Sequence, residues 1–97
     1  MKKVMVDTNS GHQEAFCEAE FTRLVAGEIM TFWVTKSKDS DGLVVTHAQS
    51  GRMVCNVDVL ATALKGSLEA GEKSLNEYLA KTGELRFLNA VRKLKPS

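Results

Sequence analysis

Three short segments rich in β-branched and aromatic residues follow one another between residues 29 and 57, and they limit the possible folds most strongly. They are 29–36 (IMTFWVTK), 43–48 (LVVTHA) and 52–57 (RMVCNV). Such residues favour strands. The loop at 39–42 and the Ser50-Gly51 dipeptide between the segments are typical of turns. Two consecutive hairpins predict a three-stranded antiparallel meander over residues 28–57.

The forty residues after the meander carry helical signals. Asn56 or Asp58 can cap a first helix, and SLNE at 74–77 matches a capping box. Gly66 and Gly83 are suited to the ends of helices. The helices predicted on these grounds cover residues 59–65, 74–81 and 84–94.

Residues 12–26 (HQEAFCEAEFTRLVA) permit two interpretations. In a strand, Cys17, Ala19 and Phe21 would alternate with polar residues. In a helix, the apolar residues would share one face, and Gly27 would end the helix (Cys17, Phe21, Leu24 and Val25). Because helix-forming residues dominate the segment, we predict a helix.

The whole chain of 97 residues is expected to form one small α+β domain (1–97). It would contain a three- to four-stranded antiparallel sheet, an N-terminal helix and two to three C-terminal helices. A strand candidate at 3–6 and turn chemistry at 8–11 precede the first helix. An apolar share of 43% and a charged share of 26% match the globular average, which excludes a disordered chain.

The net charge of +1 is too small to indicate nucleic-acid binding by the whole protein. The C-terminal segment is mildly basic, and a nucleic-acid-associated accessory protein would use Arg86, Arg92, Lys93 and Lys95. The other interpretation of these cations is favourable charge at the C-terminal end of a helix.

The stretch VMVDTNSG at residues 4–11 resembles the start of a PIN-domain nuclease. That resemblance implies that Asp7 binds a divalent cation, which activates water. Such a site needs further carboxylates late in the chain, but no Asp follows Asp58. We therefore interpret Asp7 as the end of an edge strand beside a turn.

The histidines and cysteines offer a second route to an enzyme. The gaps from His12 to Cys17 and from His47 to Cys55 do not match zinc-ligand pairs, so we expect no metal and no cofactor. Cys55 with His47 could form a thiol–imidazole pair only if the pKa of the thiol were lowered. A small metal- or thiol-dependent enzyme would be built on Asp7, His12, His47 or Cys55.

We therefore expect a non-enzymatic binding or protein-interaction module that acts as a homodimer. Its partner would be itself, another protein or a small apolar ligand. No apolar run approaches the about 18 residues of a membrane span, and no secretory signal is visible, so we expect a cytoplasmic protein. The predicted binding residues are Met30, Phe32, Trp33, His47 and Tyr78.

Overall fold

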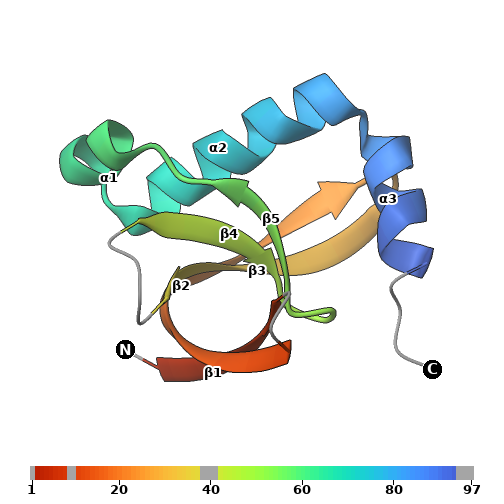
Figure 1. The fold of residues 1–97 in the computed structure, drawn as a ribbon. Helices are drawn as coiled ribbons and strands as arrows, with labels where there is room; N and C mark the ends of the chain where they lie inside the picture. Colours follow the sequence, from red (N-terminus) through yellow and green to blue (C-terminus); the bar gives the residue numbers. More distant parts are fainter. Residues whose placement is uncertain (1, 9–10, 38–41, 94–97) are drawn as a thin grey trace.

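In the described part of the computed structural model, five strands form a closed barrel, and three helices follow them (Figure 1). The structure describes residues 2–8, 11–37 and 42–93. Helices α1 and α2 lie across one side of the barrel, opposite β1. The elements are β1 (Lys2–Thr8), β2 (Gly11–Val25), β3 (Glu28–Ser37), β4 (Leu43–His47), β5 (Arg52–Asn56), α1 (Val59–Lys65), α2 (Ser67–Thr82) and α3 (Glu84–Lys93).

The predicted N-terminal helix is wrong, because residues 12–26 lie mainly in the long strand β2. In a strand, side chains alternate between two faces, so residues four apart lie on the same face. In a helix, which turns once every 3.6 residues, residues four apart also lie on nearly the same face. Cys17, Phe21 and Val25 are buried in the strand, so their spacing could not distinguish the two structures. Leu24 does distinguish them: it would be buried in the predicted helix but is 59% exposed here.

A tight turn at Ala26 and Gly27 connects β2 to β3. Both residues have positive φ, 47° and 87°, the backbone that two-residue hairpin turns favour because it matches strand twist. Gly27 therefore forms a hairpin turn and does not end a helix. In the middle of β2, the register with β3 shifts between Cys17 and Ala19. This bulge lets the strand bend toward closure of the barrel.

The predicted three- to four-stranded sheet is also wrong in strand number. Strands β3, β4 and β5 pair as the two predicted antiparallel hairpins. However, β1 pairs with β2 on one side and with β5 on the other. The predicted turn at 8–11 and the loop at 39–42 lie partly outside the described residues, which omit 9–10 and 38–41.

The first and last strands run parallel where they meet, because five consecutive antiparallel strands leave β1 and β5 pointing the same way. Asp7 and Arg52 are the residue pair in register. The N–H of Asp7 donates to the carbonyl of Gly51 at 2.7 Å, and Arg52 Nε lies 2.9 Å from Asp7 Oδ2. Asp7 thus joins two strands and does not end an edge strand.

The helices begin and end mostly at the expected residues. Asp58 caps α1 by accepting a hydrogen bond from the N–H of Leu60, and Gly66 ends the helix. The second helix is longer than predicted, because α2 starts at Ser67 and the SLNE segment lies inside it. Gly71 also lies inside α2, where it permits close approach to Val34.

The core lies between the helices and one face of the strands they cover. Phe32, Val34 and Val45 are fully buried there. They pack in one cluster with residues of α2 and α3, chiefly Leu75, Leu79, Phe87 and Leu88. Among the described residues, no helix has the length and apolar character needed to span a membrane.

Candidate functional site

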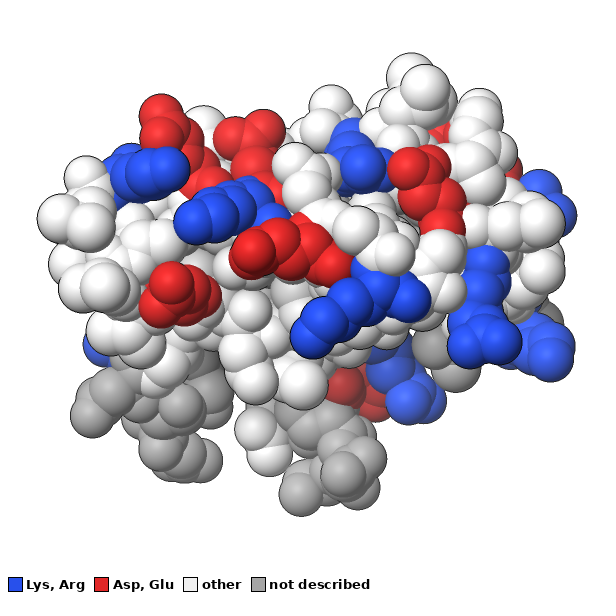
Figure 2. Space-filling view, turned by 90° about the horizontal axis from the view of Figure 1, so that it is seen from above, with Lys and Arg blue, Asp and Glu red and all other residues white. Residues whose placement is uncertain are grey.

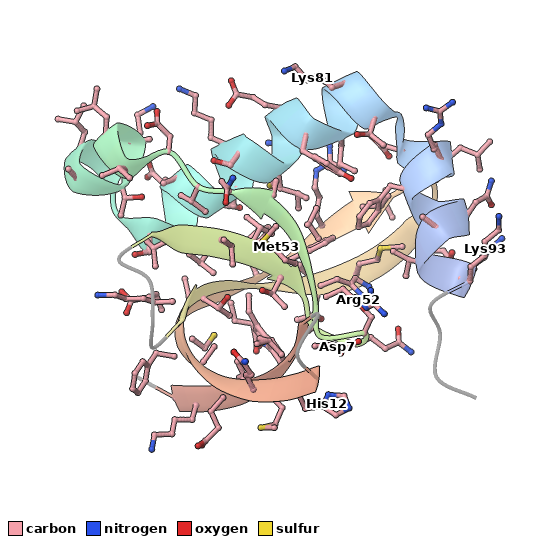
Figure 3. All side chains as sticks on the ribbon, viewed as in Figure 1. Asp7, His12, Arg52, Met53, Lys81 and Lys93 are labelled. Carbon is pink, nitrogen blue, oxygen red and sulfur yellow. The ribbon has the colours of Figure 1, made fainter. Side chains whose placement is uncertain are left out.

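The residues of the predicted metal-dependent enzyme are brought together only in part. Asp7 and His12 lie opposite each other in the register of β1 and β2, but the carboxylate of Asp7 pairs with Arg52, and His12 is exposed (Figure 3). Within residues 2–8, 11–37 and 42–93, no group of three or more His, Cys, Asp or Glu side chains is placed to hold a metal ion. The carboxylate of Asp7 therefore neutralises an arginine where the barrel closes.

The two thiols are free and lie in surroundings that disfavour the thiolate. Burial raises the pKa of Cys55 from 9.0 to about 11, because a charged sulfur would lose its hydration. Burial also raises the pKa of Cys17, and this effect is larger than the lowering by the charge of Lys2 and by a backbone hydrogen bond with Ala19. Neither thiol thus has the lowered pKa that nucleophilic chemistry requires.

Four of the five predicted binding residues lie on the helix side of the barrel wall. Phe32 is fully buried, with its ring centroid 5.7 Å from that of His47. Met30 is also buried, and Tyr78 contacts Phe87 at a centroid distance of 6.1 Å. Trp33 points to the opposite face, where its indole N–H donates to Glu20. Trp33 therefore does not lie on the same face as the other four predicted residues.

His47 lines two adjoining cavities beneath α3. The larger, which we call the His47 cleft, has a volume of about 220 Å³. The smaller, of about 130 Å³, includes Tyr78 and Phe87 in its wall. The residues lining the His47 cleft are Glu28, Ile29, Met30, Thr31, His47, Gln49, Ser50, Leu88, Val91 and Arg92. Two predicted binding residues, Met30 and His47, thus share this cleft.

The turn between β4 and β5 fixes the imidazole of His47. The N–H of Ser50 donates to Nδ1 at 3.2 Å, and the hydroxyl of Ser50 lies 2.9 Å from the same nitrogen. The N–H of Arg52 in turn donates to that hydroxyl oxygen. Because Nδ1 is an acceptor, the proton of the neutral ring lies on Nε2. Burial lowers the pKa of His47 and so favours this neutral form.

The barrel interior contains a further cavity of about 320 Å³, lined by inward side chains of all five strands. Thr35 and Thr46 are buried in its wall and hydrogen-bond to each other at 3.0 Å. Other polar residues that line this cavity are Asp7, Gln13, Glu14 and Asn56. The apolar side chains that line it include Val6, Ala15, Val44 and Met53.

The outward face of α1 is an apolar surface that the sequence prediction missed. Its residues, Val59, Leu60, Ala63 and Leu64, are exposed, and only Ala61 of the helix is buried. Val59, Leu60 and Leu64 are 72%, 67% and 77% exposed. Five apolar residues in a seven-residue helix exceed what one face can bury, and this signal was available in the sequence. At the α1 end of the molecule, Figure 2 shows uncharged surface.

The basic residues of α3 do not form a separate positive field. Arg92 pairs with Glu28 at 3.1 Å, while Arg86 and Lys93 are exposed. Lys95 lies outside the described residues. Figure 2 shows acidic and basic side chains interleaved over most of the helical side of the molecule, with a few basic side chains next to one another at its right-hand end. This pattern is weaker than the basic patch typical of nucleic-acid binding.

The fold and these surfaces define a small barrel-and-helix domain with one apolar outer face and one buried histidine at a cleft. Comparisons with models of protein families, with curated proteins and with solved structures found no match. The proposals below therefore rest on the geometry of this chain.

Proposed function

We propose that the protein is a non-enzymatic binding module that pairs with a second copy of itself through the outward face of α1. One observation carries the proposal: Leu60 and Leu64 are mostly exposed on a helix that buries only Ala61. Scattered exposed leucines are common, but adjoining ones mark interaction surfaces, because a partner removes their apolar area from water.

The shape of the surface supports a second copy as the partner. Residues in a helix are about 100° apart, so Leu60 and Leu64 form one ridge, and Val59 and Ala63 form a parallel ridge beside it. An apolar hollow of about 230 Å³ adjoins the second ridge. The hollow is lined by Leu43, Val57, Val59, Thr62 and Ala63. A two-fold arrangement can place the leucines of each copy in the hollow of the other, as an isologous interface requires.

Charge is compatible with this pairing. The outward face carries no Lys, Arg, Asp or Glu among its four residues, and the net charge of the chain is only +1. Two copies therefore meet without burying like charges, which would cost several kcal/mol. A seven-residue helix is only about 10 Å long. Its face supplies less than the about 800 Å² per partner of a stable complex, so we expect a weak, concentration-dependent dimer.

The test is the molar mass in solution over a wide range of protein concentration, measured by sedimentation or light scattering. The wild type is expected to pass from monomer to dimer as concentration rises. Replacing the ridge (Leu60→Gln with Leu64→Gln) should keep the protein monomeric, because two amides would be buried unpaired at the interface.

Leu85→Gln is the matched control, since Leu85 is 64% exposed but lies on α3. That variant should dimerise like the wild type. Exposed substitutions of this kind change stability by only about 0.5 kcal/mol, so all variants should fold. A wild type that stays monomeric at every concentration would contradict the proposal, as would dimers of the ridge variant.

A further inference from the structure

The His47 cleft combines a few apolar side chains with several polar ones, and among the polar ones the imidazole of His47 is held in a fixed orientation. Met30, Leu88 and Val91 supply apolar side chains from β3 and α3. The cleft volume of about 220 Å³ exceeds the about 150 Å³ of an engineered apolar cavity that binds benzene. A molecule with one ring and a small substituent therefore fits the available space.

The Nε2–H group of His47 is the polar group that lacks a protein partner. The hydrogen bonds of this side chain to the described residues all involve Nδ1. No buried side-chain nitrogen or oxygen in the described part of the chain is without a partner. Nε2 is therefore not enclosed by protein, although His47 as a residue is only 4% exposed. The two cavities that His47 lines are the open spaces described beside its ring.

The ring is held still in this orientation. Phe32 and Phe87 contact it edge-on, with centroid distances of 5.7 and 6.3 Å. Ser50 holds Nδ1 from the other side of the ring. A donor fixed in this way loses little conformational entropy when it binds an acceptor.

We propose that the His47 cleft binds a small uncharged molecule with an apolar body and a carbonyl-type acceptor, which takes the hydrogen bond from His47 Nε2–H. Among the described residues that line the cleft, the only charged ones are Glu28 and Arg92, which pair with each other at 3.1 Å. An ionic ligand would thus be buried without a free counter-charge, which disfavours it. The His47 cleft is separate from the outward face of α1. A result that contradicts the proposed dimer therefore leaves this proposal unaffected, and the reverse is also true.

Two isosteric probes test the proposal on the full chain. Acetophenone carries a carbonyl oxygen, and α-methylstyrene has a methylene group in its place. Each is titrated while NMR follows the His47 ring and the methyl groups of Met30, Leu88 and Val91. Both probes should shift these signals in a saturable way. Acetophenone should bind about three- to tenfold more tightly, as expected for one neutral hydrogen bond.

The variant His47→Phe keeps an aromatic ring but removes the donor. It should lose the preference for acetophenone and bind α-methylstyrene at least as tightly, because the carbonyl would be buried without a donor, while Leu85→Gln should keep the preference for acetophenone. If His47→Phe does not fold, the comparison of the two probes on the wild type still decides the matter. Equal affinities on the wild type would overturn the proposal. So would the absence of saturable shifts, or shifts at Val6, Ala15 and Val44 in the barrel interior instead.

Discussion

At the scale of single residues, His47 should make stability depend on pH. Its folded-state pKa is lowered by burial, whereas in the unfolded chain it is expected near 6.5. Between these two values the unfolded chain binds the proton and the folded protein does not. The free energy of unfolding should therefore be at its full value above pH 6.5 and fall as the pH drops toward the lowered pKa.

Urea unfolding at a series of pH values measures this effect. Carboxylates contribute to the same pH range, so the wild type is compared with His47→Gln, which lacks the titrating group. The variant should lose less stability between pH 7 and 5 than the wild type, whatever its stability at pH 7. An NMR titration of the His47 ring with a midpoint at or above 6.5 would contradict this expectation.

The prediction of binding residues from the sequence also depends on the position of single residues. Strand alternation places Met30 and Phe32 on one face of β3 and Trp33 on the other. Because both faces carry apolar side chains, the segment alone does not reveal which face the helices cover. The sequence indicates His47 as a binding residue only through its residue type. The orientation of its ring depends on the turn at Ser50, which positions Nδ1.

At the scale of elements, Gly71 sets how closely α2 approaches β3. A Cβ built at this position would collide with Cγ2 of Val34. In a helix with free space beside the glycine, Gly→Ala is expected to raise the free energy of unfolding by about 0.5–1 kcal/mol. Here Gly71→Ala should destabilise by about 1–3 kcal/mol, because the core is overpacked. Chemical denaturation measures the change.

Val34→Ala is the matched background for this experiment, since it removes the colliding methyl group. In that background Gly71→Ala should become neutral or stabilising. The same cost in both backgrounds would show that contact with Val34 is not the cause.

Elements with local signals were predicted well, and those that depend on distant partners were not. Helix α1 has a cap at Asp58 and an end at Gly66, both readable from a few residues. By contrast, β2 contains many helix formers, and it becomes a strand because β1 and β3 hydrogen-bond to it on both sides. Propensity is a weak guide where tertiary pairing overrides it.

At the scale of the whole molecule, Gly51 is where the barrel closes. Its φ is 73°, and a Cβ there would lie 3.2 Å from the backbone nitrogen of Asp7 and 3.4 Å from the carbonyl of Met5. Gly51→Ala should therefore lower the free energy of unfolding in two ways. The left-handed backbone would cost about 1–2 kcal/mol for a residue with a side chain. The added methyl group would also push β1 away from the turn. Chemical denaturation provides the measurement.

Gly27→Ala isolates the first effect, since Gly27 has a φ of 87° and open space around its Cβ position. We expect Gly51→Ala to cost more than Gly27→Ala. Equal costs would mean that the approach of β1 to this turn contributes nothing. The sequence could not predict this closure, because no local pattern reveals that Asp7 and Arg52 become neighbours.

The parallel junction of β1 and β5 has a consequence during synthesis on the ribosome. Strand β1 is made before β5 and can pair with it only after Arg52 has also emerged. Until then, one backbone edge of β1 is unpaired and can meet the nascent chains of adjacent ribosomes. Among the strands that the structure describes, β1 therefore waits through the longest stretch of translation for its second neighbour.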